Sequence, residues 1–525
     1  MKRLCIKTIL LLFASIFMEF EAFAKRTIDV TSIGIKNDGI TNNTILFQKI
    51  VNNNSYKNTV LYFPAGRYLL GPTILKSDIE IRLDTNATIL ASTNRLDYGH
   101  DDAQALFYAK NERNIILSGK GTIDGQGTAL VTDLYQKLES GTITDPTWKT
   151  FNPWFQKRPT ESNRPKILFF DQVYNIVIDG ITIKNGSSWI QDYRNCEKIV
   201  INNIKVKSNC YWNNDGIDIV DSKNVVLQNS FFDVADDGIC LKSESPDRKC
   251  EDIVIDNCKV RSSASAIKLG TASWGGFENI KIKNIHVYDT YRSAIAIESV
   301  DGGTVKNIEV ENIDAVNTGN GIFIKLGNRN KTNNISQLEN IVLKNIKVRI
   351  PSSKPDNGYP MEGPVLKFSP LVLNAPETQD WLNRPDIDTS IFQYPHNVFP
   401  SSISGLPKHP VKNIRLENIE LIYEGGGNKS KAYYPLDSAK FILEGEKYYP
   451  EFSMFGELPV SGLYVRHAEK LSFNNVTIRF TNPDFRVVTL FEDVNGLNIQ
   501  KMNIIGIPKE RWMHKIDVQD ITFKK

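Results

Sequence analysis

The sequence is poor in cysteine and has no large excess of charge of either sign. It contains 6 cysteines in 525 residues, and five remain once an N-terminal segment that includes Cys5 is removed. The odd number and the spacing match no zinc-binding pattern, so we predict no structural zinc site. One disulfide or buried free thiols both remain open. The formal net charge of +3 provides no basic stripe, so we expect no nucleic-acid partner.

Two further absences exclude common cofactors. The 6 histidines show no metal-ligand spacing. The glycine run in "YEGGGNK", residues 423–429, lacks the strand, Gly-Lys-Ser/Thr and helix order of a phosphate-binding loop. We therefore predict no metal ion and no other cofactor.

No long apolar run is present, and the most hydrophobic segment has the features of a signal peptide over residues 1–24. A basic start precedes an apolar stretch from Thr8 to Phe17, and Ala22-Phe23-Ala24 forms an A-x-A cleavage site. Glu19 and Glu21 interrupt the roughly 20 apolar residues that a membrane span needs. We expect a protein exported to the periplasm or the extracellular space, not inserted in a membrane, and monomeric.

What the sequence does contain is a repeat of about 28 residues. Related segments begin at Asn224 ("NVVLQNSFF"), Asp252 ("DIVIDNCKV"), Asn279 ("NIKIKNIHV") and Asn307 ("NIEVENIDA"), at intervals of 28, 27 and 28 residues. A fixed period of this length indicates a solenoid. Apolar and polar residues alternate with period two, Ile and Val dominate, and Asn or Gly falls at the bends. The prediction is an all-β protein, a single-stranded right-handed parallel β-helix.

A second set of short strands fixes the register of one wall. One isoleucine per coil marks it, at Ile217, Ile239, Ile267, Ile295 and Ile322. Residues at equal offsets from this marker should stack about 4.8 Å apart on successive coils. The predicted ladder two residues before the marker contains Asp215, Asp237 and Ser265, and the ladders after it contain Asp218, Lys242, Lys268, Glu298 and Lys325.

The remaining segments are less regular. We predict one β-helix domain over residues 25–525, with an N-terminal cap and the first coils in 25–100 and a short capping helix over 44–52. The Trp- and Pro-rich segment 126–166 is expected to form a loop over the wall. The Pro- and Ser-rich segment 350–411 breaks the period and is interpreted as a long excursion from the solenoid.

Four acids, Asp215, Asp218, Asp236 and Asp237, should converge on this wall. Like charges this close raise the pKa of at least one carboxyl group. Two functions fit: Ca²⁺ binding, which uses six to eight oxygen ligands, and inverting glycoside hydrolysis. The latter needs one acid beside the leaving oxygen and one carboxylate to activate water, roughly 6.5–9.5 Å apart.

Four motifs stand out in the sequence: "NNDGID" (213–218), "DDGICLK" (236–242), "GTIDGQG" (121–127) and the N-terminal "GIKNDGITNNT". Together they resemble the motifs of glycoside hydrolase family 28, the polygalacturonases and rhamnogalacturonan hydrolases. The resemblance covers essentially the whole mature chain. It implies that Asp236 is the general acid, that Asp215 and Asp237 hold the attacking water, and that Asn213 and Asp218 contact the sugar.

The chain departs from the family pattern where polygalacturonases carry G-H-G and R-I-K. Ser265 stands in place of the histidine, and Ala296-Ile297-Glu298 replaces R-I-K. The usual cationic grip on a galacturonate carboxylate is therefore absent, and neither Ala nor Glu can replace a bidentate arginine. Lys242, Lys268 and Lys325 are candidates to supply the cation from other ladders, and we count Ser265 and Glu298 among the substrate-binding candidates.

The resulting hypothesis is a secreted hydrolase of pectic polysaccharide or oligosaccharide, of galacturonan or rhamnogalacturonan type. Loops at both ends of the site would favour action at chain ends. A β-helix polysaccharide lyase, with Lys242 or Lys268 as base, is the first alternative. A non-catalytic carbohydrate-binding solenoid is the second.

Overall fold

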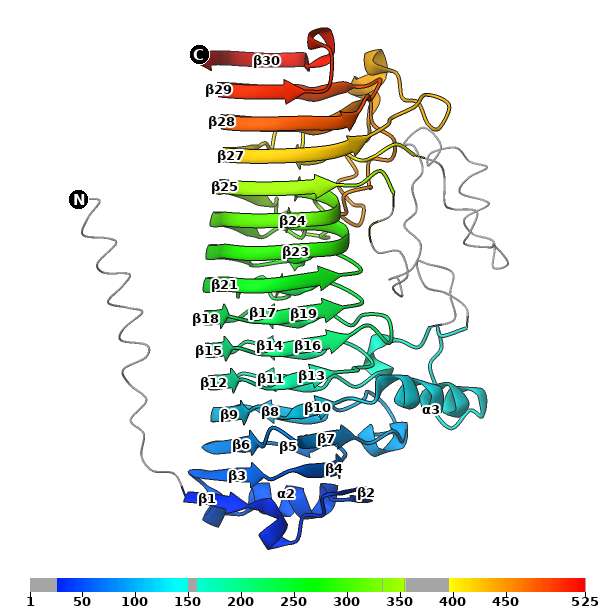
Figure 1. The fold of residues 1–525 in the computed structure, drawn as a ribbon, viewed down its shortest axis with the longest axis vertical. Coiled ribbons are helices and arrows are strands. Elements are labelled where there is room, and N and C mark those ends of the chain that lie inside the picture. Colours follow the sequence, from blue (N-terminus) through cyan, green and yellow to red (C-terminus); the bar gives the residue numbers. More distant parts are fainter. Residues whose placement is uncertain (1–25, 150–157, 333, 354, 356–395, 525) are drawn as a thin grey trace, which may run out of the picture.

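The computed structural model describes residues 26–149, 158–332, 334–353, 355 and 396–524, which form a stack of parallel coils (Figure 1). Thirty strands in these residues belong to one continuous sheet, and the strands pair in parallel with the next coil along the stack. The fold is the predicted right-handed parallel β-helix. The signal-peptide prediction for residues 1–24 falls outside the described residues.

In the N-terminal half each coil after the first contributes one short strand to each of three walls, and the first coil contributes a strand to two of them. The strands of the first wall are β1 (Arg26–Asp29), β3 (Thr59–Phe63), β6 (Ile79–Leu83), β9 (Arg113–Gly119), β12 (Tyr174–Asp179), β15 (Glu197–Asn202) and β18 (Lys223–Gln228). Those of the second wall are β2 (Asp38–Asn42), β4 (Gly66–Leu70), β7 (Ala87–Ala91), β10 (Thr122–Asp124), β13 (Thr182–Lys184), β16 (Lys205–Ser208) and β19 (Phe231–Val234). Those of the third wall are β5 (Thr73–Ile74), β8 (Phe107–Lys110), β11 (Leu168–Asp171), β14 (Gln191–Arg194), β17 (Ile217–Val220), β20 (Ile239–Ser243) and β22 (Ile267–Ser273).

Towards the C-terminus the strands, apart from the four-residue β26 (Ser401–Ser404), run around the bends without a break. They are β21 (Cys250–Ser262), β23 (Gly276–Ser299), β24 (Thr304–Leu326), β25 (Gln337–Ile350), β26 (Ser401–Ser404), β27 (Val411–Gly425), β28 (Val460–Asn482), β29 (Val487–Ile505) and β30 (Met513–Lys524). The one-turn 3₁₀ helices are η1 (Val30–Ile33), η2 (Asn54–Tyr56), η3 (Arg95–Tyr98), η4 (Glu161–Asn163), η6 (Leu436–Phe441) and η7 (Lys509–Arg511).

The alternation of apolar and polar residues places the apolar side chains inside the coils, where equivalent residues stack in ladders. Ile253, Ile280, Ile308 and Ile341 pair on successive coils and are at most 1% exposed. They belong to one aliphatic core that runs the length of the stack.

The asparagines at the bends hold the coils together in a second way. Asn284, Asn312, Asn345, Asn418 and Asn475 form a ladder in which each amide donates to the preceding carbonyl oxygen at 2.9–3.0 Å. All five have positive φ, the left-handed conformation that asparagine tolerates better than most residues. The bends therefore turn at asparagine for both backbone and side-chain reasons.

The predicted register of the third wall is confirmed. Ile217 pairs with Ile239, Ile239 with Ile267, Ile267 with Ile295 and Ile295 with Ile322. The predicted capping helix is also confirmed as α2 (Thr44–Asn52), which buries Phe47, Ile50 and Val51 over the first coil.

The prediction of a loop over residues 126–166 is wrong for its first part. Residues Gly127–Glu139 form the helix α3, which projects beside the stack (Figure 1). Leu130, Leu134 and Leu138 recur at four-residue spacing on its buried face, and Leu134 and Leu138 pack in a small cluster with Trp148. The leucine period indicates a helix, and the Trp and Pro content of the segment had masked it.

The segment 350–411 separates two coils that stack directly on each other. Strand β25 pairs with β27, from Glu339 opposite Lys412 to Ile350 opposite Tyr423. The Asn418 side chain donates to Asn345 across 73 residues of sequence. The end of the segment is not part of an excursion, because strand β26 (Ser401–Ser404) pairs with β24 and β28 within the stack. The residues before it lie mostly outside the described residues, so their interpretation as an excursion stays a prediction, as does the single-domain division of the chain.

The described part of the chain answers two smaller questions. Its five cysteines are free thiols, four of them buried, which decides against a disulfide among them. None of the helices in the described ranges combines the length and the apolar character that crossing a bilayer would require.

Candidate active site

The four acids meet on the third wall because two Asp-Gly-Ile segments stack there. Gly216 N–H donates to the Asp237 carbonyl oxygen at 2.9 Å, and Gly238 N–H donates to that of Ser265 at 2.8 Å. A Cβ on Gly216 would lie 2.5 Å from the Gly238 carbonyl oxygen, so a side chain would push the coils apart. The glycines thus permit the close approach that places Asp215 and Asp237 on one ladder.

One half of the cluster is built on Lys242. Its ammonium lies 3.0 Å from Asp215 Oδ2, contacts Asp218 Oδ1 as well, and stands 3.8 Å from the centre of the Trp189 ring. Asp215 is 4% exposed, Asp218 0% and Lys242 9%. A single ammonium therefore serves two buried carboxylates.

The other half is built on Asp237. Its Oδ2 accepts from Lys268 at 2.9 Å and its Oδ1 accepts from the Ser265 backbone N–H at 3.0 Å. Lys268 also donates to the Tyr449 hydroxyl at 3.0 Å. Ser265, which stands where the family pattern carries a histidine, thus contributes to the cluster through its main chain.

Asp236 faces a different set of partners. Its Oδ1 accepts from the Asp237 backbone N–H at 2.8 Å, and Asn213 Nδ2 lies 3.5 Å from its Oδ2. Asn213 is oriented by Arg164, whose Nη2 donates to Asn213 Oδ1 at 2.6 Å. Arg164 also donates to the carbonyl oxygens of Ser187 and Trp212, so it ties three segments together behind the acid.

The environments separate the pKa values of these acids, as the like-charge prediction requires. Burial raises the pKa of Asp215 to about 6, against the opposing effect of Lys242. Burial and the neighbouring Asp215 raise the pKa of Asp218 well above its usual value. Burial also acts on Asp237, but Lys268 and Arg292 outweigh it and hold its pKa below the usual value. Asp237 is therefore the carboxylate that stays ionised.

Asp215 and Asp237 each place a carboxylate oxygen within 4.8 Å of the other and of the Cys240 thiol. This group does not fit Ca²⁺, which takes six to eight oxygen ligands. It offers two carboxylates that already bind ammonium groups, and a thiol whose pKa is raised by burial. Two carboxylates this close can instead share one water molecule.

Two predicted substrate-binding residues lie further along the wall. Glu298 is 1% exposed, and burial raises its pKa to about 7 despite the nearby charge of Lys268. Lys325 pairs with Glu298 in the register but is fully buried, with Phe455 5.6 Å from its ammonium. Its charged neighbours are Glu444, Arg466 and Glu446, so the structure does not bring Lys325 to the acid cluster.

Sequence reasoning missed several residues that complete the site. They are Arg164, Trp189, Arg292, Tyr449 and Glu451. Tyr449 and Glu451 come from residues 426–459, a non-repetitive connection that carries no period. Arg292 did carry a signal, since it stands three residues before its marker isoleucine, as Asp236 does.

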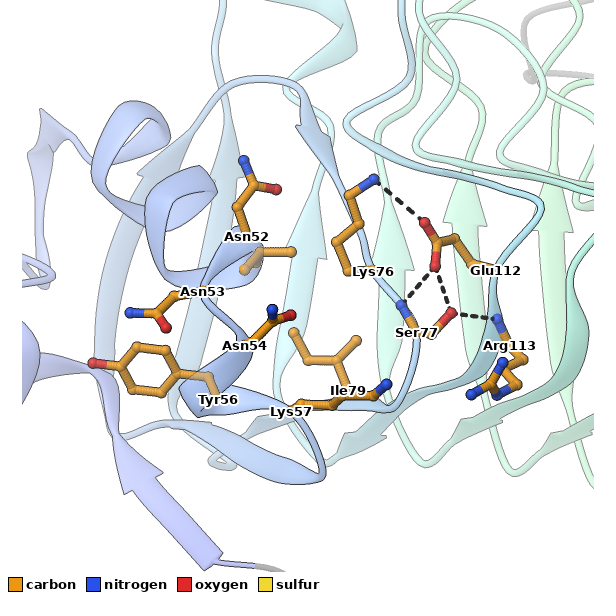
Figure 2. Close-up of a pocket in the computed structure, with 11 residues that line it drawn as sticks. Asn52, Asn53, Asn54, Tyr56, Lys57, Lys76, Ser77, Ile79, Glu112 and Arg113 are labelled. Atoms are coloured by element: carbon orange, nitrogen blue, oxygen red, sulfur yellow. Dashed lines mark hydrogen bonds and ion pairs between the residues drawn. The ribbon is translucent and has the colours of Figure 1, made fainter.

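A separate hollow lies at the N-terminal end of the stack, with a volume of about 470 Å³ (Figure 2). Its polar groups bind one another: Glu112 accepts from Lys76 at 3.3 Å and from the Ser77 backbone N–H at 2.8 Å, and Arg113 N–H donates to Ser77 Oγ at 3.0 Å. None of the four acids lines it. The acid cluster, not this hollow, is the candidate active site.

Comparison with known proteins agrees with the β-helix fold. A protein-family model for glycosyl hydrolases family 28 matches residues 54–354, more than half of the chain. The class is therefore that of the glycosidases. The chain belongs to glycosyl hydrolases family 28, as its motifs predicted.

The curated relatives are distant. An exo-poly-α-D-galacturonosidase of Dickeya chrysanthemi is 27% identical over 41% of this chain and 41% of its own length. A probable polygalacturonase of Vitis vinifera is 24% identical over 59% of each. The chain thus spans about two fifths to three fifths of these two relatives. An exopolygalacturonase of Zea mays is 23% identical over 77% of this chain and 85% of its own.

Solved structures support the fold. A family 28 exopolygalacturonase of Yersinia enterocolitica has a TM-score of 0.57 at 18% identity and covers 95% of this chain and 78% of its own. An exopolygalacturonase of Thermotoga maritima has a TM-score of 0.56 at 20% identity, with coverage of 76% and 87%. At these identities the likeness concerns the fold alone.

Proposed function

We propose that this protein is an exported glycosidase that hydrolyses uronate-containing pectic chains, of galacturonan or rhamnogalacturonan type, with inversion at the anomeric carbon. Membership of family 28 and the polygalacturonase activity named for its relatives support the pectic substrate. The A-x-A site at residues 22–24 supports export.

One observation carries the mechanism: Asp215 and Asp237 place oxygens within 4.8 Å of each other on adjacent coils, with Asp236 next in the chain. In the proposed reaction these two carboxylates hold a water molecule and accept its proton. The water oxygen bonds to the anomeric carbon while the bond to the leaving oxygen breaks. Asp236 gives its proton to that oxygen, so each of the two products carries a new hydroxyl group where the bond was broken.

The lyase alternative needs a neutral lysine or another free base in the site. Lys242 and Lys268 are both bound to carboxylates, and Asp215, Asp218 and Asp237 raise the pKa values of these lysines against the effect of burial. Protonated lysines do not abstract protons. These contacts favour hydrolysis over elimination.

The decisive experiment incubates the purified protein with homogalacturonan, a rhamnogalacturonan backbone and a neutral glucan as negative control. Hydrolysis should yield new reducing ends and no unsaturated products from one of the pectic polymers. Asp236→Asn should lose about 10³-fold or more in kcat while it still binds the substrate. The matched control is Asp252→Asn, an exchange at a bend of the stack that should leave kcat unchanged.

Two outcomes would refute the proposal. Unsaturated products would identify a lyase. Sugar binding with no turnover on any of the polymers would identify a binding solenoid. The order in which products appear adds the mode of action: small saccharides from the first minutes indicate attack at chain ends, as the neighbouring Tyr449 and Glu451 segment would favour by limiting the length of chain beyond the site.

A further inference from the structure

Arg292 lies on the same ladder as Asp236. The backbone N–H of Arg292 donates to the Ala264 carbonyl oxygen at 2.8 Å, and Ala264 lies one coil on from Asp236. The backbone N–H of Asp236 in turn donates to the Asn214 carbonyl oxygen at 3.4 Å. Successive rungs are about 4.8 Å apart, so the Cα atoms of Asp236 and Arg292 are separated by roughly 10 Å. Ala264 between them has no side chain beyond Cβ, which leaves Arg292 room to reach towards the acids.

The Arg292 side chain is buried, and its Nε has no acceptor. The residue is 4% exposed, and Nε, one of the five N–H donors of the guanidinium, is fully buried with no hydrogen-bond partner among the described residues. Its nearest charge is Glu451, whose Oε2 lies 3.5 Å from Nε without forming a hydrogen bond. Buried donors of this kind are nearly always satisfied, and leaving one unsatisfied costs about 1–3 kcal/mol.

The other cations at the acid cluster are already in use. Lys242 binds Asp215 and Asp218, Lys268 binds Asp237 and Tyr449, and Arg164 binds Asn213. In the described part of the site, Arg292 is thus the cation beside Asp236 and Asp237 with donors to spare. Its planar fork matches a carboxylate in a way that a single ammonium does not.

We propose that Arg292 is a specificity-determining residue that binds the carboxylate of a uronosyl unit next to the cleaved bond. Arg292 would supply a cation for the substrate carboxylate from the ladder of Asp236. The positions where the family pattern has such cations hold Ala296 and Glu298 in this chain. This inference rests on the proposed function for its substrate class. Glu451 then limits how tightly the anion is held, because its own charge competes for the same guanidinium.

The test measures binding separately from turnover, in protein that carries Asp236→Asn and therefore keeps its ligand intact. Calorimetry compares an acidic pectic oligosaccharide with its methyl-esterified form, before and after adding Arg292→Gln. We expect Arg292→Gln to weaken binding of the acidic ligand about 10- to 100-fold, because charge-assisted hydrogen bonds are lost. Binding of the methyl ester should weaken by less than about threefold. Glu451→Gln should strengthen binding of the acidic ligand.

Two control variants keep the result interpretable. Arg292→Lys retains the charge and should recover part of the acidic ligand's affinity, and it serves if the glutamine variant does not fold. Arg329→Gln removes an arginine already paired with Asp301 at 2.9 Å and should change neither affinity. An equal loss for acid and ester in Arg292→Gln, or full affinity in both, would overturn the inference.

The proposed function can fail separately. Protein that binds the acidic ligand through Arg292 but cleaves none of the pectic polymers in its wild-type form would contradict hydrolysis and keep the arginine's role. Absence of any binding of the acidic ligand to Asp236→Asn would overturn the inference itself.

Discussion

Asp215 and Asp237 occupy neighbouring rungs of one ladder, both are buried, and each binds a lysine, yet their pKa values shift in opposite directions. The difference is the number of cations per carboxylate. Lys242 is shared between Asp215 and Asp218, whereas Asp237 has Lys268 and the nearby charge of Arg292. A regular scaffold therefore yields unequal carboxyl groups through the side chains of adjacent coils.

The largest expected effect comes from removing the ionised member of this pair. Asp237→Asn should lower kcat about 10³-fold, because it removes the carboxylate that stays ionised and one of the two oxygens proposed to hold the attacking water. Initial rates on a pectic oligosaccharide, with the melting temperature as a control for folding, measure it. Near-normal kcat in a folded variant would show that Asp237 is not part of the base.

Removal of Lys242 should have the largest effect on stability. Lys242→Met leaves Asp215 and Asp218 buried without their ammonium, and breaking a buried pair in this way costs about 3–5 kcal/mol at pH 7. The folded-state pKa values of both acids lie above their unfolded values. As the pH falls, these acids therefore become protonated in the folded protein before they do so in the unfolded chain. The loss should therefore shrink from pH 7 to pH 5, as denaturant unfolding at both values would measure. A loss that grows on acidification would contradict the shared-ammonium account.

Removal of Lys268 should affect Asp237, and its effect should be seen in the pH dependence of kcat. Lys268 lowers the pKa of Asp237, so Lys268→Met should raise that pKa and move the acidic limb of the kcat profile to higher pH. The expected wild-type profile is bell-shaped. An unshifted acidic limb in Lys268→Met would mean that another group controls the base.

The smallest effect is expected away from the acids, in the asparagine ladder. Asn312→Ala removes hydrogen bonds to Asn284 and Asn345 and places alanine at a φ of 58°, for a loss of about 1–2 kcal/mol. Asn312→Gly keeps the backbone relaxed and should lose less than the alanine variant. Neither should alter kcat; a changed kcat in a folded variant would show that the stack and the site are coupled.

The contrast between stack and site also explains how much the sequence could predict. The marker isoleucines predicted the correct register because a similar short strand recurs once per coil, at steps of 22, 28, 28 and 27 residues. The convergence of Asp215 and Asp237 followed from that register. Arg292 could have been found in the same way, by extending the ladder of Asp236 to Ala264 and one rung further.

Other parts of the site could not be read from periodicity. Tyr449 reaches Lys268 from a segment 181 residues later in the chain, with no repeat to relate the two. Lys242 and Lys268 were predicted on the correct wall, but a ladder position does not tell whether a lysine binds substrate or a neighbouring acid. That depends on side-chain distances, which here favour the acids.

The most direct test of the two-carboxylate site is the anomeric configuration of the first product, followed by proton NMR during cleavage of a pectic oligosaccharide. A water held by Asp215 and Asp237 on the face opposite Asp236 predicts that the first product carries the configuration inverse to that of the broken bond. A first product with retained configuration would require a covalent enzyme intermediate and would contradict this account.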